Sequence, residues 1–317
     1  MEVQVNKVKP SDYDPTHTTA LRNAFARDFK LRFTALKKVI RRAVDEMDCF
    51  GLKKEKINVN ELNPPPIARI FEFLSDSKKI EAFMRWLEIQ VEKGLLTITE
   101  FRQIGSAINE AWTNRYIADS YKRGIMRARS EMKKAGMNIP PLDETGGLDA
   151  VFNLPYHLER VGVLYIRVYS ELKGITAAME TTISQILSQG MIDGDGPRLI
   201  ARKLVSAIDG VNMGSLGITD SLGRFIPAQR RAIILARTEI IRAHHLAMVQ
   251  EYRNWGLEGV KVLAEWATAD DDRVCPICAA LEGKIFTLDE VEPLIPRHPQ
   301  CRCVILPYIE DIKQYYN

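Results

Sequence analysis

Apolar residues recur every three or four positions through most of the chain, which is the spacing of one face of an amphipathic helix. The first such stretch runs from Leu21 to Met47. It follows Asp14 and Pro15, a favourable N-cap and first helical position, and Gly51 is expected to end it. The expected helices cover residues 15–50, 77–94, 104–134, 155–189, 197–210 and 227–255.

The pattern changes after residue 256. "GVKVLAEWAT" alternates apolar and polar side chains, as a half-buried strand does. Two shorter strand candidates, "KIFTL" and "CVILPYI", follow it. The expected fold class is therefore mainly α with a small C-terminal α+β zinc-binding module.

Proline and glycine mark the breaks between these segments. "KINVNELNPPP" is held out of a helix by its prolines, and "GMNIPPLDETGG" is the clearest linker. The glycine-rich "GVNMGSLGITDSLGRF" follows no strand and matches no phosphate-binding motif. A chain of 317 residues exceeds the size of most single cores. The expected division is a helical N-terminal region (1–136), a linker (137–147), a helical middle region (148–226) and a C-terminal module (227–317).

Charge is distributed unevenly, although the net charge is only +3. The first expected helix is strongly basic, whereas the chain from Glu258 onward has eleven acidic and six basic residues. The basic faces of the first and third helices are candidates for non-specific DNA contact or for an acidic patch on a partner protein. The sequence has neither an apolar run long enough for a membrane span nor a recognisable secretion signal, so we expect a cytoplasmic protein without membrane association.

Four of the five cysteines lie in two clusters near the C-terminus. A cytoplasmic protein keeps its thiols reduced, so clustered cysteines indicate metal ligands more than disulfides. The spacing fits a structural zinc site, which would stabilise a small sheet with little core of its own. Disulfides and reduced, packed cysteines remain alternatives. The candidate ligands are Cys275, Cys278, His298 and Cys301, with Cys303 the alternative to His298 for the fourth place.

Other polar residues have simpler interpretations than catalysis. Neighbours on a helix diverge by about 100°, so at most one of His244 and His245 should face a given site, and we expect one at the boundary of a packed face. Arg237 and Glu239 should each contact a different neighbour. The Asp270–Asp272 run favours a turn over a cation site. The isolated Cys49 is expected to be a small buried residue.

Several motifs in order resemble the Mu-F-like minor head proteins of tailed bacteriophages, the phage head-morphogenesis family. They are "ARTE" (236–239), the strand ending in Trp266, "DDRVCPIC", "LEGKIF" and "HPQCRC", over about residues 230–307. The resemblance implies a minor structural protein near the portal vertex of the phage head, acting in head morphogenesis and also in DNA packaging or ejection. It implies a location in the virion, and in the host cytoplasm during assembly.

The same resemblance implies partners and a site. The expected partner is the portal protein, with the scaffold or major capsid protein as further candidates. The family's cysteine and histidine positions are all filled in this chain, and no catalytic residues carry over. The alternative function is a zinc-dependent nuclease or toxin-like enzyme, in which a three-ligand metal activates water and His244, His245 or His298 acts as a base. Five available donors favour a closed site, and so an assembly protein.

Overall fold

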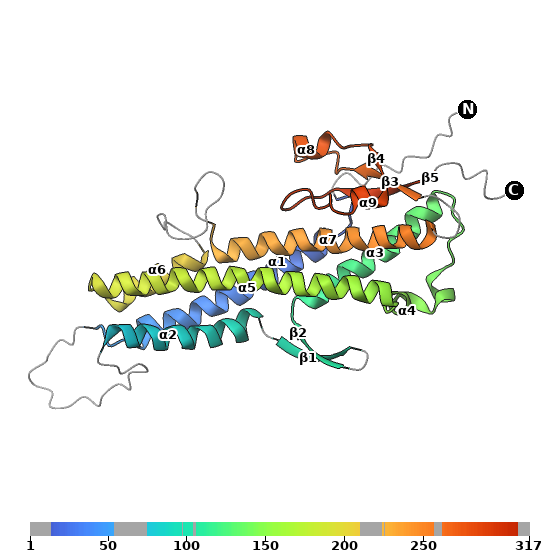
Figure 1. Cartoon of the computed structure of the whole chain (residues 1–317). Helices are drawn as coiled ribbons and strands as arrows, with labels where there is room; N and C mark the ends of the chain where they lie inside the picture. Colours follow the sequence, from blue (N-terminus) through green and yellow to red (C-terminus); the bar gives the residue numbers. More distant parts are fainter. Residues whose placement is uncertain are drawn as a thin grey trace, which may run out of the picture. The chain divides into compact units, whose positions relative to one another are not determined.

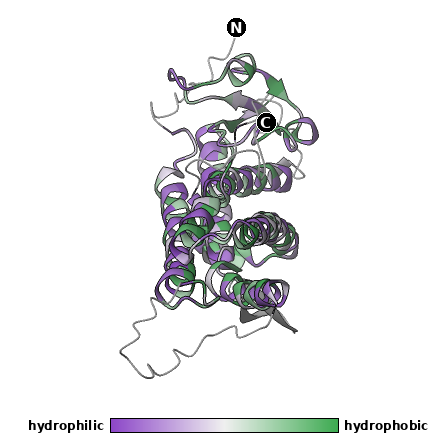
Figure 2. Ribbon diagram, turned by 90° about the vertical axis from the view of Figure 1, so that its left-hand side faces the viewer, coloured by the Kyte–Doolittle hydropathy of each residue, from purple (hydrophilic) through white to green (hydrophobic). Residues whose placement is uncertain are grey.

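The computed structural model is mainly helical and ends in a small three-stranded sheet, which confirms the expected fold class (Figure 1). It describes residues 14–53, 75–96, 98–103, 106–209, 224, 226–256 and 262–309. Green and purple residues alternate along each helix in Figure 2, as the apolar spacing predicted.

The helices and strands have the following bounds. The α-helices are α1 (Thr19–Arg41), α2 (Asp76–Val91), α3 (Asn114–Lys134), α4 (Gly147–Phe152), α5 (Pro155–Ile192), α6 (Pro197–Asp209), α7 (Ala228–Gly256), α8 (Pro276–Ala279) and α9 (Leu288–Val291). Two π-helical turns, η1 (Arg42–Glu46) and η2 (Glu92–Leu96), and one 3-10 turn, η3 (Leu142–Thr145), accompany them. The strands are β1 (Ile98–Gln103), β2 (Ser106–Ala111), β3 (Val262–Ala267), β4 (Ile285–Phe286) and β5 (Val304–Ile309).

Packing divides the chain into two compact units, and α1, α5 and α7 contribute residues to both. The first unit comprises Met1–Ala26, Thr113–Val168 and Ile234–Asn317. The second comprises Arg27–Trp112 and Tyr169–Ile233. The four-part division expected from the sequence stays a prediction, because it divides the chain into consecutive stretches and not by packing.

In the first unit, the sheet has the order β4-β3-β5 with antiparallel neighbours. Trp266 on β3 is fully buried and lies opposite Ile305 on β5. One hydrophobic core joins these strands to residues of α3 and α7, including Met132 and Tyr252. The sheet therefore stabilises itself by packing on the helices, as a sheet of this size requires.

Helix α1 starts later than the sequence predicted. Asp14 is not its N-cap residue, and the helix begins at Thr19. The Asp14 carboxylate instead closes the turn before it, accepting hydrogen bonds from the backbone N–H groups of Thr16, Thr18 and Thr19 at 3.1, 2.9 and 2.7 Å. Burial alone would raise the pKa of Asp14, but Arg22 at 2.9 Å and the threonine hydrogen bonds lower it to about 2.

The second unit has an aromatic core. Phe29, Phe33 and Phe83 are fully buried, and the indole Nε1 of Trp112 donates to the carbonyl of Leu95 at 2.6 Å. Cys49 is fully buried in this unit, as expected, and burial raises the pKa of its thiol to about 12.

The predicted third helix was wrong in its first part. Ser106–Ala111 forms β2, which pairs antiparallel with β1 (Ile98–Gln103), and α3 begins only at Asn114. Cross-strand pairing decided the structure of this stretch, and a pattern along one segment does not reveal its partner. The helix ends at Lys134 as predicted, and Gly136 has a left-handed φ of 95°.

Two expected loops lie outside the described residues. They are "KINVNELNPPP" and the glycine-rich loop at 210–225, of which only Arg224 is described. The linker near residues 137–147 contains the turn η3. Among the described residues, no helix combines the length and apolar character needed to cross a bilayer.

Candidate metal centre

The first cysteine pair lies on a single helical turn. Cys275 is the N-cap of α8 and Pro276 occupies its first position, where a missing N–H costs nothing. The Sγ of Cys275 accepts a hydrogen bond from the N–H of Cys278 at 3.4 Å. Residues three apart on a helical turn share a face, so both sulfurs point the same way.

The second cluster consists of His298, Cys301 and Cys303. It lies in the irregular segment between α9 and β5. The N–H of Cys301 donates to the carbonyl of His298 at 3.1 Å and closes a turn. Nδ1 of His298 lies 2.9 Å from the carbonyl of Pro299, so this nitrogen carries the proton and donates. The other ring nitrogen, Nε2, faces the sulfurs of the first cluster.

The fold brings the two clusters together. Nε2 of His298 lies 3.3 Å from the sulfurs of both Cys275 and Cys278. The donor atoms of these three residues all lie within 4.8 Å of one another, and so do those of Cys278, Cys301 and Cys303. Cys278 belongs to both groups, so all five candidate residues converge on one region.

This donor set fits zinc. Thiolate and imidazole are its preferred ligands, and tetrahedral coordination places a sulfur and a nitrogen ligand about 3.5 Å apart. The distances from His298 to the first cluster are close to that value. Cys278, Cys301 and Cys303 are all nearly inaccessible to solvent. Buried sulfurs in contact, without disulfides, are well suited to a structural ion.

Hydrogen bonds and burial give the cysteine thiols different pKa values. Hydrogen bonds from the Cys303 side chain and from the backbone of Cys303 and Arg297 lower the pKa of Cys301 to about 5. Backbone N–H groups also lower the pKa of Cys275. The pKa of Cys303 is raised, first by its hydrogen bond to Cys301 and then by burial. Cys301 is thus the more acidic thiol of its pair.

Helix α7 holds the second cluster in place through residues that the sequence had not connected with it. The N–H of Gln300 donates to Oγ1 of Thr238 at 3.1 Å, and Nη1 of Arg237 donates to Oε1 of Gln300 at 3.0 Å. Gln300 has a left-handed φ of 63°, a conformation that these two contacts maintain. Two residues of the "ARTE" motif, Arg237 and Thr238, therefore position the loop that contains the candidate ligands His298 and Cys301.

A second attachment joins the second cluster to the turn that precedes the first. Arg302, between Cys301 and Cys303, forms a two-pronged pair with Asp271 at 2.6 and 2.5 Å. The hydrogen bonds from Arg302 lower the pKa of Asp271. Asp271 also accepts from the backbone N–H of Arg273 at 3.1 Å, so it makes the turn expected for the aspartate run. Through its pair with Arg302, Asp271 also holds the HPQCRC segment in place.

The remaining sequence candidates have structural contacts. Arg237 contacts Gln300, whereas Glu239 pairs with Arg167 and Arg242, which confirms that the two face different neighbours. Both paired histidines are buried, which corrects the expectation that one lies at a boundary. Nε2 of the second, His245, lies 3.1 Å from the carbonyl of Val291 and holds α9 against α7.

Sequence reasoning missed a buried polar network in the first unit. The hydroxyl of Tyr121 lies 3.0 Å from Nδ1 of His157, and Nε2 of this histidine lies 3.0 Å from Glu251. Trp255 and Arg129 also contact the Glu251 carboxylate, at 3.3 and 3.5 Å. Both oxygens of the carboxylate have partners, and burial raises the pKa of Tyr121. The network is thus a satisfied structural one. No local sequence pattern predicts this network, because its members are distant from one another in the sequence.

Comparison with protein families matches part of the chain. Residues 181–306 match the family model described as Phage Mu protein F like protein, a range that starts within α5 and ends within β5. It includes all five metal-ligand candidates. No curated protein and no solved structure matches the chain.

Proposed function

Because residues 181–306 match the family model of phage Mu protein F like proteins, we propose that the chain is a minor structural and assembly protein of a phage head. It acts in head morphogenesis at the portal vertex and takes part in DNA packaging or ejection. It is found in the virion, and in the host cytoplasm during assembly. The portal protein is its main partner, and the scaffold or major capsid protein is a further candidate.

The C-terminal module contributes a metal-supported surface to this role. Cys275, Cys278, His298 and Cys301 hold a zinc ion, and Cys303 is the alternative fourth ligand. When bound, the ion supplies cross-linking energy, about 10–16 kcal/mol in small zinc modules. The convergence of five donor residues from two chain segments carries this proposal.

The protein groups around the ion orient the ligands. The carbonyl of Pro299 fixes the tautomer of His298, and the N–H of Cys278 stabilises charge on the sulfur of Cys275. Gln300 and Arg302 attach the second cluster to α7 and to the turn at Asp271. These contacts stabilise the ligand positions before the ion binds, which lowers the cost of ordering on binding.

Metal analysis of the purified protein tests the site. We expect one zinc ion per chain, retained in the Cys303→Ser variant and lost in Cys278→Ser. Incubation with plasmid DNA in the same preparation tests the role, and we expect no cleavage. Cleavage that His298→Ala abolishes and Cys303→Ser preserves would instead establish a zinc-dependent nuclease, with an open coordination position.

Association is tested separately from the metal. The full chain is mixed with the portal protein of the same phage at low and moderate salt, and co-elution is measured. We expect a complex that survives moderate salt. Failure to associate in both conditions would contradict the placement at the portal vertex, whatever the metal content.

A further inference from the structure

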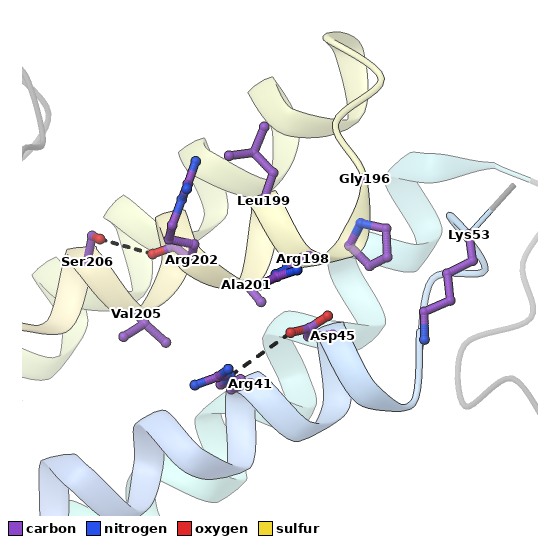
Figure 3. Close-up of a pocket in the computed structure, with 11 residues that line it drawn as sticks. Arg41, Asp45, Lys53, Gly196, Arg198, Leu199, Ala201, Arg202, Val205 and Ser206 are labelled. Atoms are coloured by element: carbon purple, nitrogen blue, oxygen red, sulfur yellow. Dashed lines mark hydrogen bonds and ion pairs between the residues drawn. The ribbon is translucent and has the colours of Figure 1, made fainter.

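The second unit contains a basic groove that the proposed metal-supported role does not use. It has a volume of about 870 Å³ and lies between the end of α1 and the helix α6 (Figure 3). Four cations line it against a single carboxylate, Asp45. The cations are Arg41, Lys53, Arg198 and Arg202.

These cations are available for a partner. Arg198 and Arg202 are exposed and form no ion pair among the described residues. The side chain of Arg41 is 67% exposed and lies 4.0 Å from Asp45, a distance at which an exposed pair contributes little. By contrast, Lys203 on the same helix pairs with Asp195 at 2.5 Å. The groove is therefore positively charged through side chains with little internal neutralisation.

The floor of the groove is apolar and made of short side chains. Arg198, Ala201, Arg202 and Val205 recur at the spacing of one face of α6, so two small apolar residues alternate with two long cations. Ala201 is buried and Val205 half-buried. Figure 3 shows both projecting from α6 on the side of Arg41. A ligand in this groove can bury apolar groups on the floor and place negative charge at the rim.

We propose that this groove binds an acidic amphipathic helix of a partner protein. Such a helix carries apolar side chains on one face and carboxylates beside them, which matches the apolar floor and the cationic rim. A nucleic acid fits less well. Its phosphates would satisfy the cations, but the lining has no aromatic ring on which bases could stack. The apolar floor would then stay unused.

Fluorescence anisotropy with the full chain tests the proposal. The probe is a labelled helical peptide of about 20 residues, with leucines on one face and glutamates on both sides of it. We expect Arg198→Glu with Arg202→Glu to weaken binding by roughly tenfold or more. The matched control, Lys30→Glu with Lys38→Glu, changes the net charge equally on exposed positions of α1 outside the groove and should leave affinity unchanged.

Two further binding measurements separate the contribution of the apolar floor from that of the charged rim. Val205→Thr keeps the side-chain size but adds a hydroxyl to the floor, and it should weaken binding several-fold without charge reversal. A peptide of the same composition with its leucines scattered should bind roughly tenfold more weakly. Equal affinity for both peptides would overturn the proposal, and so would a thymidine oligonucleotide that displaces the ordered peptide. Circular dichroism of each variant ensures that loss of binding reflects the groove and not unfolding, and the milder Arg198→Gln with Arg202→Gln replaces any variant that unfolds.

Discussion

Gln300 shows how one residue can control a metal-ligand loop from outside the ligand set. We expect Gln300→Gly to lose the contact with Arg237 but to adopt the left-handed φ easily. Gln300→Ala loses the same contact but keeps the backbone strain of about 1 kcal/mol that any residue with a Cβ has at this φ and that glycine relieves. Zinc affinity should therefore fall about tenfold in both variants, and thermal stability should fall further in the alanine variant.

Competition with a chromogenic chelator measures the affinity, and thermal melting measures the stability. Arg237→Ala serves as the matched variant, since it removes the other partner of the same hydrogen bond. If the contact acts as proposed, combining Arg237→Ala with Gln300→Gly adds little to either single change. Full additivity, or unchanged zinc affinity in all three proteins, would contradict a positioning role.

The buried neighbours His244 and His245 predict a dependence of stability on pH. Burial lowers the pKa of His244 to about 3 and that of His245 to about 4. In the unfolded chain both titrate near their ordinary value of about 6.5, so between pH 6.5 and 4 the unfolded state binds more protons than the folded state. The free energy of unfolding should therefore fall as the pH falls through this window, by at most about 1.4 kcal/mol per pH unit for each histidine.

Denaturant unfolding at pH 7, 6 and 5, compared with His244→Asn and His245→Gln together, checks this expectation. Loss of metal in acid affects both proteins, so the difference between their pH slopes isolates the histidines. Asp14, with a pKa of about 2, titrates below the window. The variant should be less stable at pH 7 but should lose less stability on acidification. Identical slopes would show that other groups cause the acid sensitivity.

At the scale of elements, a close contact between two helices depends on Gly124. A Cβ built on this residue of α3 would lie 2.4 Å from the carbonyl oxygen of His244 and 2.6 Å from the Cβ of Ala247, both on α7. Gly124→Ala should therefore push the helices apart and cost about 1–3 kcal/mol. The control is Gly162→Ala on α5, where nothing lies within 4 Å, and it should stabilise the helix by about 0.5–1 kcal/mol. Thermal melting that shows the same sign for both would contradict the packing argument.

How far the elements could be predicted depended on what determines each one. Helix α7 followed from a local pattern with a proline at its start and a glycine at its end, and the structure differs by a single residue at each end. The β1–β2 hairpin could not be predicted, because its pairing depends on a second segment. For the candidate site, the spacing of the cysteines and His298 was sufficient to predict that they converge. The contact between Gln300 and Arg237 was not predictable, since 63 residues separate them.

At the scale of the whole molecule, the C-terminal sheet is attached to the helices by apolar packing and ion pairs, in addition to the proposed metal site. Its core is continuous with α3 and α7, and Arg253 pairs with Asp289 at 2.5 Å. Arg160 of α5 pairs with Glu292. The structure places the sheet inside a unit that includes residues from three parts of the chain. Loss of the ion should therefore affect helices as well as strands.

Hydrogen exchange of Cys278→Ser tests this consequence. A small sheet that loses its ion also loses order in the apolar surface with which it covers α7, so the segment from Ile241 to Tyr252 should exchange faster together with β3 and β5. Helix α2 belongs to the second unit and should keep its protection. The Cys303→Ser variant is the control if His298, and not Cys303, is the fourth ligand. Faster exchange confined to the strands would show that α7 is stable without the sheet, and faster exchange in α2 would show that both units unfold as one.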